Sequence, residues 1–271
     1  MIRRDIPLAD GSAGWMLISQ IEHARISAEV AKYCIGGLCD ASQRAGESPP
    51  PAPIRDVVLN AIRHHDDGWA DWEQSPQLDR NDGRPLSFTE ISHTSAIEIW
   101  SRSINAVARS GPLASWMVAG HFLRLSRSFA TSAAAADLIQ WQTEVEARRH
   151  EWFAAWQQVD AGRHSLALAD EALQWLWTFD EVSLWLCCTC TAMEPIPCAP
   201  EPYRAGRGTP IEMELDAIGA DAATARPWRF AEATLKLTIS GQVVPAACYR
   251  GPAELLAAER PQSLSWRLAQ G

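Results

Sequence analysis

The sequence predicts a mainly α protein, a helical bundle with a small C-terminal antiparallel β appendage. Apolar residues recur at helical spacing through most of residues 1–193, whereas beyond residue 210 the apolar period becomes two. Between these parts, residues 194–210 carry five prolines and two glycines, too many for a continuous helix. We therefore expect a helical body over residues 1–193, a proline-rich linker over 194–210 and a β-rich appendage over 211–271.

Five apolar stripes at helical spacing mark the helices of the body. They cover residues 17–31, 54–69, 93–104, 114–125 and 173–184. In the same order, the stripes contain or border His23, the pair His65 and Asp66, His93, His121 and Asp180. Because such stripes normally exclude solvent-loving residues, we expect these side chains to face the interior of the bundle.

The C-terminal part alternates apolar and polar residues, which is typical of strands with one buried face. The alternation covers residues 211–215, 235–240 and 264–268. Residues 243–249 are a further candidate, which Pro245 would restrict to an edge. We expect these strands to form a small antiparallel sheet packed on the helical body.

The polar residues on the stripes predict a metal site. An isolated carboxylate in an apolar layer is strongly unfavourable unless a cation meets it. Imidazole and carboxylate together suit iron, manganese, nickel or zinc. The predicted ligands of one or two divalent ions are His23, His65, Asp66, His93, His121 and Asp180. The alternative is structural, with each histidine bonded to a backbone carbonyl and each aspartate to a helix N-terminus or an arginine.

Three further residues are candidates for catalytic roles. Arg84, in a turn-rich segment between the His65 and His93 stripes, is the first candidate for binding an anionic substrate, because guanidinium matches phosphate oxygens. Asp67 is a candidate for orienting a water or a ligand histidine. His64 is a candidate for neutralising developing charge, and it competes with His65 for the inward position. The alternative is that Arg84 pairs with a nearby aspartate and Asp67 caps local backbone.

The order of these residues resembles the HD-domain superfamily of metal-dependent phosphohydrolases. Residues 22–31 look like its first ligand helix, 61–68 like its His-Asp-x-Gly helix, and 177–185 like the helix with its final aspartate. His93 and His121 match two additional histidines of binuclear members. The interval of 42 residues from His23 to His65 is longer than the superfamily leads us to expect and implies a loop insertion. Residues 1–5, 64–69 and 227–230 also resemble a bacterial family of domains of unknown function.

The resemblance implies an HD-type helical bundle and metal-assisted hydrolysis of a small anionic substrate of the phosphoester class. Two alternatives stay open. The first is a di-iron oxygenase, because some HD-type proteins with the same ligand order have that activity. The second is a noncatalytic helical protein that binds a small ligand or a protein partner. The substrate, the metal and the oligomeric state do not follow from the sequence.

Composition restricts the partners and the location. A net charge of −9 and a pI near 5.3 argue against nonspecific nucleic-acid binding, which depends on clustered Lys and Arg. No apolar run reaches the roughly 18 residues that a membrane span needs, and no apolar segment of a signal peptide follows residues 1–5. With seven cysteines, an odd number, we expect a soluble cytoplasmic protein with free thiols. Cys187, Cys188, Cys190 and Cys198 fit no zinc-ribbon spacing, which favours packing thiols over a second zinc site.

Overall fold

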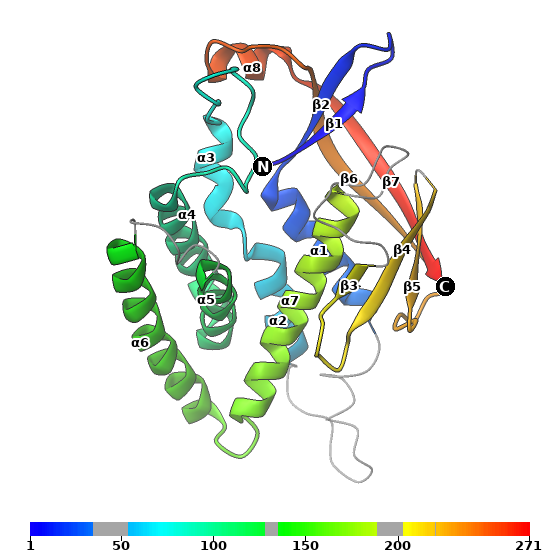
Figure 1. Cartoon of the computed structure of the whole chain (residues 1–271). Helices are drawn as coiled ribbons and strands as arrows, with labels where there is room; N and C mark the ends of the chain where they lie inside the picture. The colour runs from blue at the N-terminus through cyan, green and yellow to red at the C-terminus, as the bar shows by residue number, and fades with distance from the viewer. Residues whose placement is uncertain (35–53, 128–134, 189–202, 220) are drawn as a thin grey trace.

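A curled sheet and a set of helices packed beside it form the fold (Figure 1). The structure, a computed structural model, describes residues 1–34, 54–127, 135–188, 203–219 and 221–271. Of these described residues, 53% are helical and 24% lie in strands. The strands are therefore too numerous for an appendage, and the sheet is a major part of the fold.

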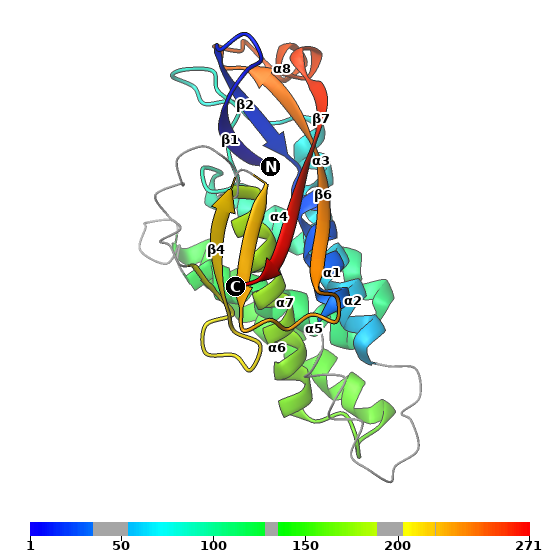
Figure 2. The same cartoon turned by 90° about the vertical axis from the view of Figure 1, so that its right-hand side faces the viewer.

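Seven strands of the described chain form one sheet, in the order β1-β2-β6-β7-β5-β4-β3. The strands are β1 (Ile2–Pro7), β2 (Ala13–Ile18), β3 (Tyr203–Ala205), β4 (Met213–Gly219), β5 (Ala222–Arg226), β6 (Thr234–Pro245) and β7 (Arg260–Gln270). Neighbours are antiparallel except β5 and β7, which are parallel. The sheet is thus mixed, and Figure 2 shows its curl.

The expected small C-terminal antiparallel appendage is wrong, and so is the mainly α fold class. Strands β1 and β2, from the N-terminus, extend the sheet through pairing of β2 with β6. Of the candidate edge strand over residues 243–249, only residues 243–245 are strand, and they are the end of β6, which lies inside the sheet, with Pro245 opposite Gly14. Strand β2 gave no alternation because Met16, Leu17 and Ile18 are all buried, as expected where both faces of a strand are covered.

The described chain forms eight helices, of which five follow the predicted stripes with changed ends. They are α1 (Gln20–Tyr33), α2 (Ile54–His64), α3 (Ala70–Gln74), α4 (His93–Ala106), α5 (Pro112–Ser126), α6 (Ala135–Val159), α7 (Leu166–Cys188) and α8 (Pro252–Ala258), with 3-10 turns η1 (Asp67–Trp69) and η2 (Val107–Ser110). Helix α1 contacts α2, α7 and β6, so it joins the sheet to the remaining helices.

Helix α1 begins directly after β2, because the Ser19 side chain accepts a hydrogen bond from the backbone N–H of Glu22. Its buried face includes His23, Ile26 and Val30, whereas Ile21 is half-buried. The face is therefore rotated from the predicted stripe toward His23. The cause is the position of α1, which is covered on one side by the sheet and on others by helices.

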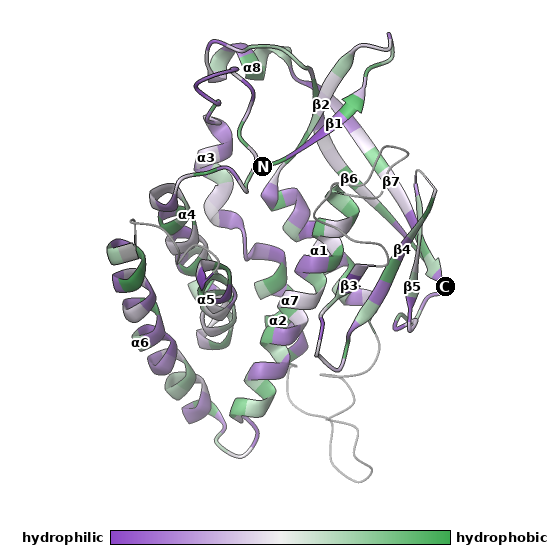
Figure 3. Cartoon of the chain, viewed as in Figure 1, coloured by the Kyte–Doolittle hydropathy of each residue, from purple (hydrophilic) through white to green (hydrophobic). Residues whose placement is uncertain are grey.

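Helix α5 lies among other helices and is buried along most of its length. It contacts α2, α4, α6 and α7. Helix α6 covers it from outside and mixes hydrophilic with hydrophobic residues along its surface (Figure 3). His121 on α5 is thus held in the interior.

Parts of two expectations lie outside the described residues. The loop insertion between His23 and His65 would occupy residues 35–53, and residues 194–202 belong to the expected linker. The remainder of that linker includes β3, which pairs with β4. None of the helices in the described part of the chain has the length and hydrophobicity needed to cross a lipid bilayer.

Gly68 permits a close approach between η1 and α4. Its N–H donates to Ser103 Oγ at 3.0 Å. A Cβ at this position would overlap the carbonyl oxygen of Ile99 and the backbone nitrogen of Ser103. Only glycine therefore lets the turn after Asp66 rest on α4.

We expect Gly68→Ala to lower the free energy of unfolding by about 1–3 kcal/mol, the usual cost of overpacking a core. Urea unfolding measures the change. Gly162→Ala is the matched control, because a Cβ there meets its nearest neighbour, Asp160 Oδ1, at an ordinary 3.6 Å. Equal stability of the two variants would contradict the close approach.

Candidate metal centre

Five of the predicted ligands converge in the interior. His23 lies on α1, His65 and Asp66 follow α2, His121 lies on α5 and Asp180 on α7. Their possible ligand atoms form two groups, His23 with His65 and Asp66, and His65 with His121 and Asp180, each with all atoms within 4.8 Å of one another. All five residues are buried, and His65 belongs to both groups.

His65 and Asp66 lie in the turn after α2, whereas the sequence suggested that the helix continues through them. The turn brings both side chains to one point. His65 Nδ1 donates a hydrogen bond to the carbonyl oxygen of Ile62, 2.8 Å away. Nε2 of the same ring lies 3.2 Å from Asp180 Oδ1 and 3.4 Å from Asp66 Oδ2. The backbone contact therefore fixes the ring with Nε2 directed at the carboxylates.

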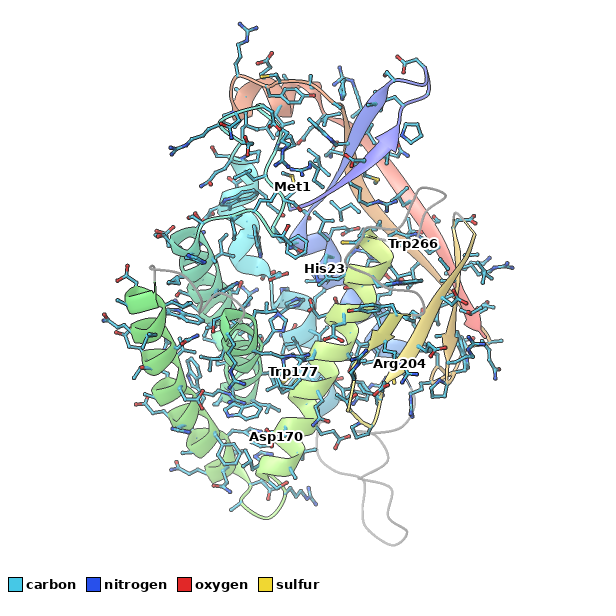
Figure 4. The ribbon with its side chains drawn as sticks, in the orientation of Figure 1. Met1, His23, Asp170, Trp177, Arg204 and Trp266 are labelled. Carbon is cyan, nitrogen blue, oxygen red and sulfur yellow. The ribbon has the colours of Figure 1, made fainter. Side chains whose placement is uncertain are left out.

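His23 lies where α1 meets α7 (Figure 4), and two serines orient its ring. His23 Nε2 lies 2.8 Å from Asp180 Oδ1, and its Nδ1 lies 2.7 Å from Ser183 Oγ. Ser183 Oγ is in turn 2.6 Å from Ser27 Oγ. The sequence did not single out either serine, although each lies one helical turn after a predicted ligand and so on the same helix face.

His121 has an unsatisfied nitrogen. Its Nδ1 is buried and has no hydrogen-bond partner among the described residues. The ring meets that of His65 edge to face, with centroids 5.2 Å apart. Burial lowers the pKa of His121 to about 3, so the ring is neutral near pH 7 and keeps a lone pair for a ligand.

The charges in the centre are strongly coupled. Burial acts to lower the pKa of His65, but Asp66 and Asp180 outweigh it and raise that pKa to about 9. Burial, reinforced by the charge of Asp180, raises the pKa of Asp66. Burial also acts to raise the pKa of Asp180, yet the surrounding histidines hold it well below its ordinary value.

A cavity of about 250 Å³ borders the centre. His23, Asp66, His121 and Asp180 lie on its wall. The rest of the described lining is mainly apolar and comes from α1, η1, α4, α5, α7 and residues 88–91. A small molecule in the cavity would therefore contact the cluster directly.

His93 does not join the five converging residues. It is the first residue of α4, is half-buried, and belongs to neither group of close ligand atoms in the described chain. The buried face of α4 begins one turn later, at Ala96. Because α4 begins at His93, this residue lies at the N-terminal end of the helix, before its buried stripe.

The three predicted catalytic residues take part in other ion pairs, and none of them lines the described cavity. His64 Nδ1 lies 2.9 Å from Asp67 Oδ2. Arg84 pairs with Asp82 at 2.9 Å and with Glu90 at 2.6 Å. These contacts match the structural alternative in which Arg84 pairs with acidic neighbours.

The cysteine cluster lies partly outside the described residues. Cys187 and Cys188 end α7, and nothing is described for Cys190 and Cys198. Burial raises the pKa of the Cys187 thiol well above its ordinary value, which disfavours the thiolate that a metal binds.

Residues 1–246 match a family described as "Protein of unknown function (DUF3891)". The chain belongs to the DUF3891 family. Comparisons with curated proteins and with solved structures give no match. The HD-domain assignment is wrong, because the family found is DUF3891 and the curled seven-stranded sheet does not fit a purely helical HD fold. Membership of DUF3891 assigns no activity, so neither a hydrolase nor a phosphohydrolase follows from the family.

The raised pKa of His65 makes stability depend on pH in the metal-free protein. The folded chain binds this proton more tightly than the unfolded chain, so the stabilisation is complete below pH 6.5 and is lost as the pH rises through about 9. We expect the free energy of unfolding in chelator to fall over this interval in the wild type and to fall less in His65→Gln. Urea unfolding at several pH values measures both. Parallel profiles for the two proteins would refute the coupling of His65 to the carboxylates.

Proposed function

We propose that the chain is a metal-dependent hydrolase with one divalent ion. Its ligands are His23, His65, Asp66, His121 and Asp180, a set that suits zinc, manganese, nickel or iron. The observation that carries the proposal is the overlap of two buried ligand groups at His65. Because one imidazole lone pair binds one ion, the shared His65 favours a single ion over two.

The unsatisfied nitrogen of His121 supports the metal. A buried polar atom without a partner is unusual in a native protein, and an ion bound at Nδ1 would satisfy it. The contacts of His65 with Ile62 and of His23 with Ser183 are of the kind that orient metal-binding histidines. A purely structural cluster leaves the His121 nitrogen and the adjacent cavity without a role.

Hydrolysis fits the groups around the cavity. When bound, a divalent ion supplies Lewis acidity and lowers the pKa of water toward neutrality. Asp66 lies on the cavity wall, where its carboxylate can receive and return a proton. The water oxygen bonds to the electrophilic atom of the substrate and the bond to the leaving group breaks. One water proton passes through the Asp66 carboxylate to the leaving group.

The expected location and partners remain predictions. We propose a cytoplasmic protein that binds neither nucleic acid nor membrane, on the basis of charge and hydropathy alone. The size of the cavity supports a small substrate.

Asp180→Asn tests the metal centre. The change removes the carboxylate charge while keeping the shape, so we expect a folded protein that loses its bound metal and any metal-dependent hydrolysis. Elemental analysis of purified protein, and titration of stripped protein with zinc, manganese, nickel and iron, measure the loss. His150→Ala is the control, because that histidine is exposed on α6. Full metal content in Asp180→Asn would refute the centre, and oxygen consumption by an iron form would refute hydrolysis.

Ser183→Ala tests the orientation of His23. Loss of an outer hydrogen bond of this kind typically weakens metal binding by about 10- to 100-fold. Calorimetric titration of the stripped protein measures the affinity. Ser126→Ala is the matched control, because Ser126 is equally buried and donates to the carbonyl oxygen of Leu123, away from the ligands. Equal affinities in the two variants would show that Ser183 does not orient a ligand.

A further inference from the structure

The cavity beside the metal ligands has an apolar wall built largely from aromatic rings. Its apolar lining includes Trp69, Phe88, Trp100, Phe122, Leu125 and Leu184. The rings of Trp100 and Phe122 are stacked, with centroids 5.7 Å apart and planes 23° apart. Such mutual packing holds the wall in place before a ligand enters, and a flat apolar group gains most from it.

Among the described residues that line the same cavity there is no lysine or arginine. Arg84 pairs with Asp82 and Glu90, and Arg124 pairs with Glu181 at 3.2 Å while it covers the Trp177 ring. The amino group of Met1 pairs with Glu73 at 2.8 Å. These three cationic groups therefore already have carboxylate or aromatic partners.

The metal centre itself would not supply the missing positive charge. One divalent ion bound by the two ionised carboxylates of Asp66 and Asp180 has a formal charge of zero. A phosphomonoester dianion would then enter a largely apolar space with no net counter-charge, which is strongly unfavourable. An uncharged substrate avoids that cost.

Gln20 adds one polar requirement. It is the first residue of α1, is buried, and lines the cavity. Its Oε1 has no hydrogen-bond partner among the described residues. A buried acceptor of this kind requires an N–H or O–H donor, which a ligand can supply.

We propose that the cavity binds an uncharged aromatic amide, with its ring against the Trp100 and Phe122 wall and its N–H donating to Gln20 Oε1. The reaction, but not the binding, rests on the proposed hydrolase function. In it the water oxygen bonds to the carbonyl carbon, the C–N bond breaks, and a water proton goes to the departing nitrogen. The products are a carboxylic acid and an amine.

The test compares two probes with the same ring, neutral benzamide and dianionic phenyl phosphate. Their affinities are measured by calorimetry or ligand-observed NMR on the full chain, both loaded with zinc and stripped by chelator. We expect benzamide to bind at least about tenfold more tightly than phenyl phosphate in both forms. Gln20→Leu should weaken benzamide by about 3- to 10-fold without changing zinc affinity.

A variant that adds a positive charge to the cavity wall should shift the preference toward the anionic probe. Leu125 lies on the cavity wall and is 40% exposed, so Leu125→Lys adds a cation without disturbing the core. It should strengthen phenyl phosphate binding by about tenfold or more, whereas the matched control Leu256→Lys, at a site 38% exposed on α8, should not.

Tighter binding of phenyl phosphate than of benzamide to the wild type would overturn the proposal, and so would binding of neither probe. Zinc affinity, measured separately, reports on the metal centre. A chain that binds zinc but prefers phenyl phosphate therefore contradicts the substrate class alone, and a chain that prefers benzamide without binding zinc contradicts the hydrolase alone.

Discussion

The buried carboxylate of Asp180 is the constraint on which the rest of the centre depends. A carboxylate removed from water must meet positive charge or hydrogen-bond donors, or folding becomes unfavourable. Asp180 meets His23 at 2.8 Å and His65 at 3.2 Å, and His121 lies in the same group of close ligand atoms. These partners come from α1, from the turn after α2, and from α5. One charge on α7 therefore requires three other segments to meet at a single point.

The sheet holds two of these segments in place. Strand β2 runs directly into α1, and Ser19 ends the strand by capping the helix. Strand β1 reaches the other helix, because Arg4 Nη1 donates at 3.0 Å to the carbonyl oxygen of Cys187 at the C-terminal end of α7. The N-terminal hairpin thus connects to both α1 and α7, between which the contact of His23 with Asp180 forms. A purely helical body would lack this link.

The sequence located buried polar residues better than it located strands, for physical reasons. A polar residue on an apolar stripe is visible in sequence because burial excludes it, and this signal found His23, His121 and Asp180. It failed for His93, since a stripe does not show at which residue a helix begins. Apolar periodicity also failed to reveal β2, because a strand buried on both faces has no alternation to separate it from a helix. Strand pairing between the two ends of the chain leaves no local pattern at all.

The order of ligands along the chain and the chemistry of the cavity are separate properties. Ligand order reflects which helices surround the cluster, and it drew the comparison with phosphohydrolases. Substrate charge depends instead on what lies on the cavity wall, where the described lining is aromatic and aliphatic beside the ligands. The desolvation argument that requires partners for Asp180 applies equally to a phosphate, which would meet no lysine or arginine among the described residues of that wall. The same physics that gathers the histidines around a carboxylate therefore underlies the proposal of an uncharged substrate beside them.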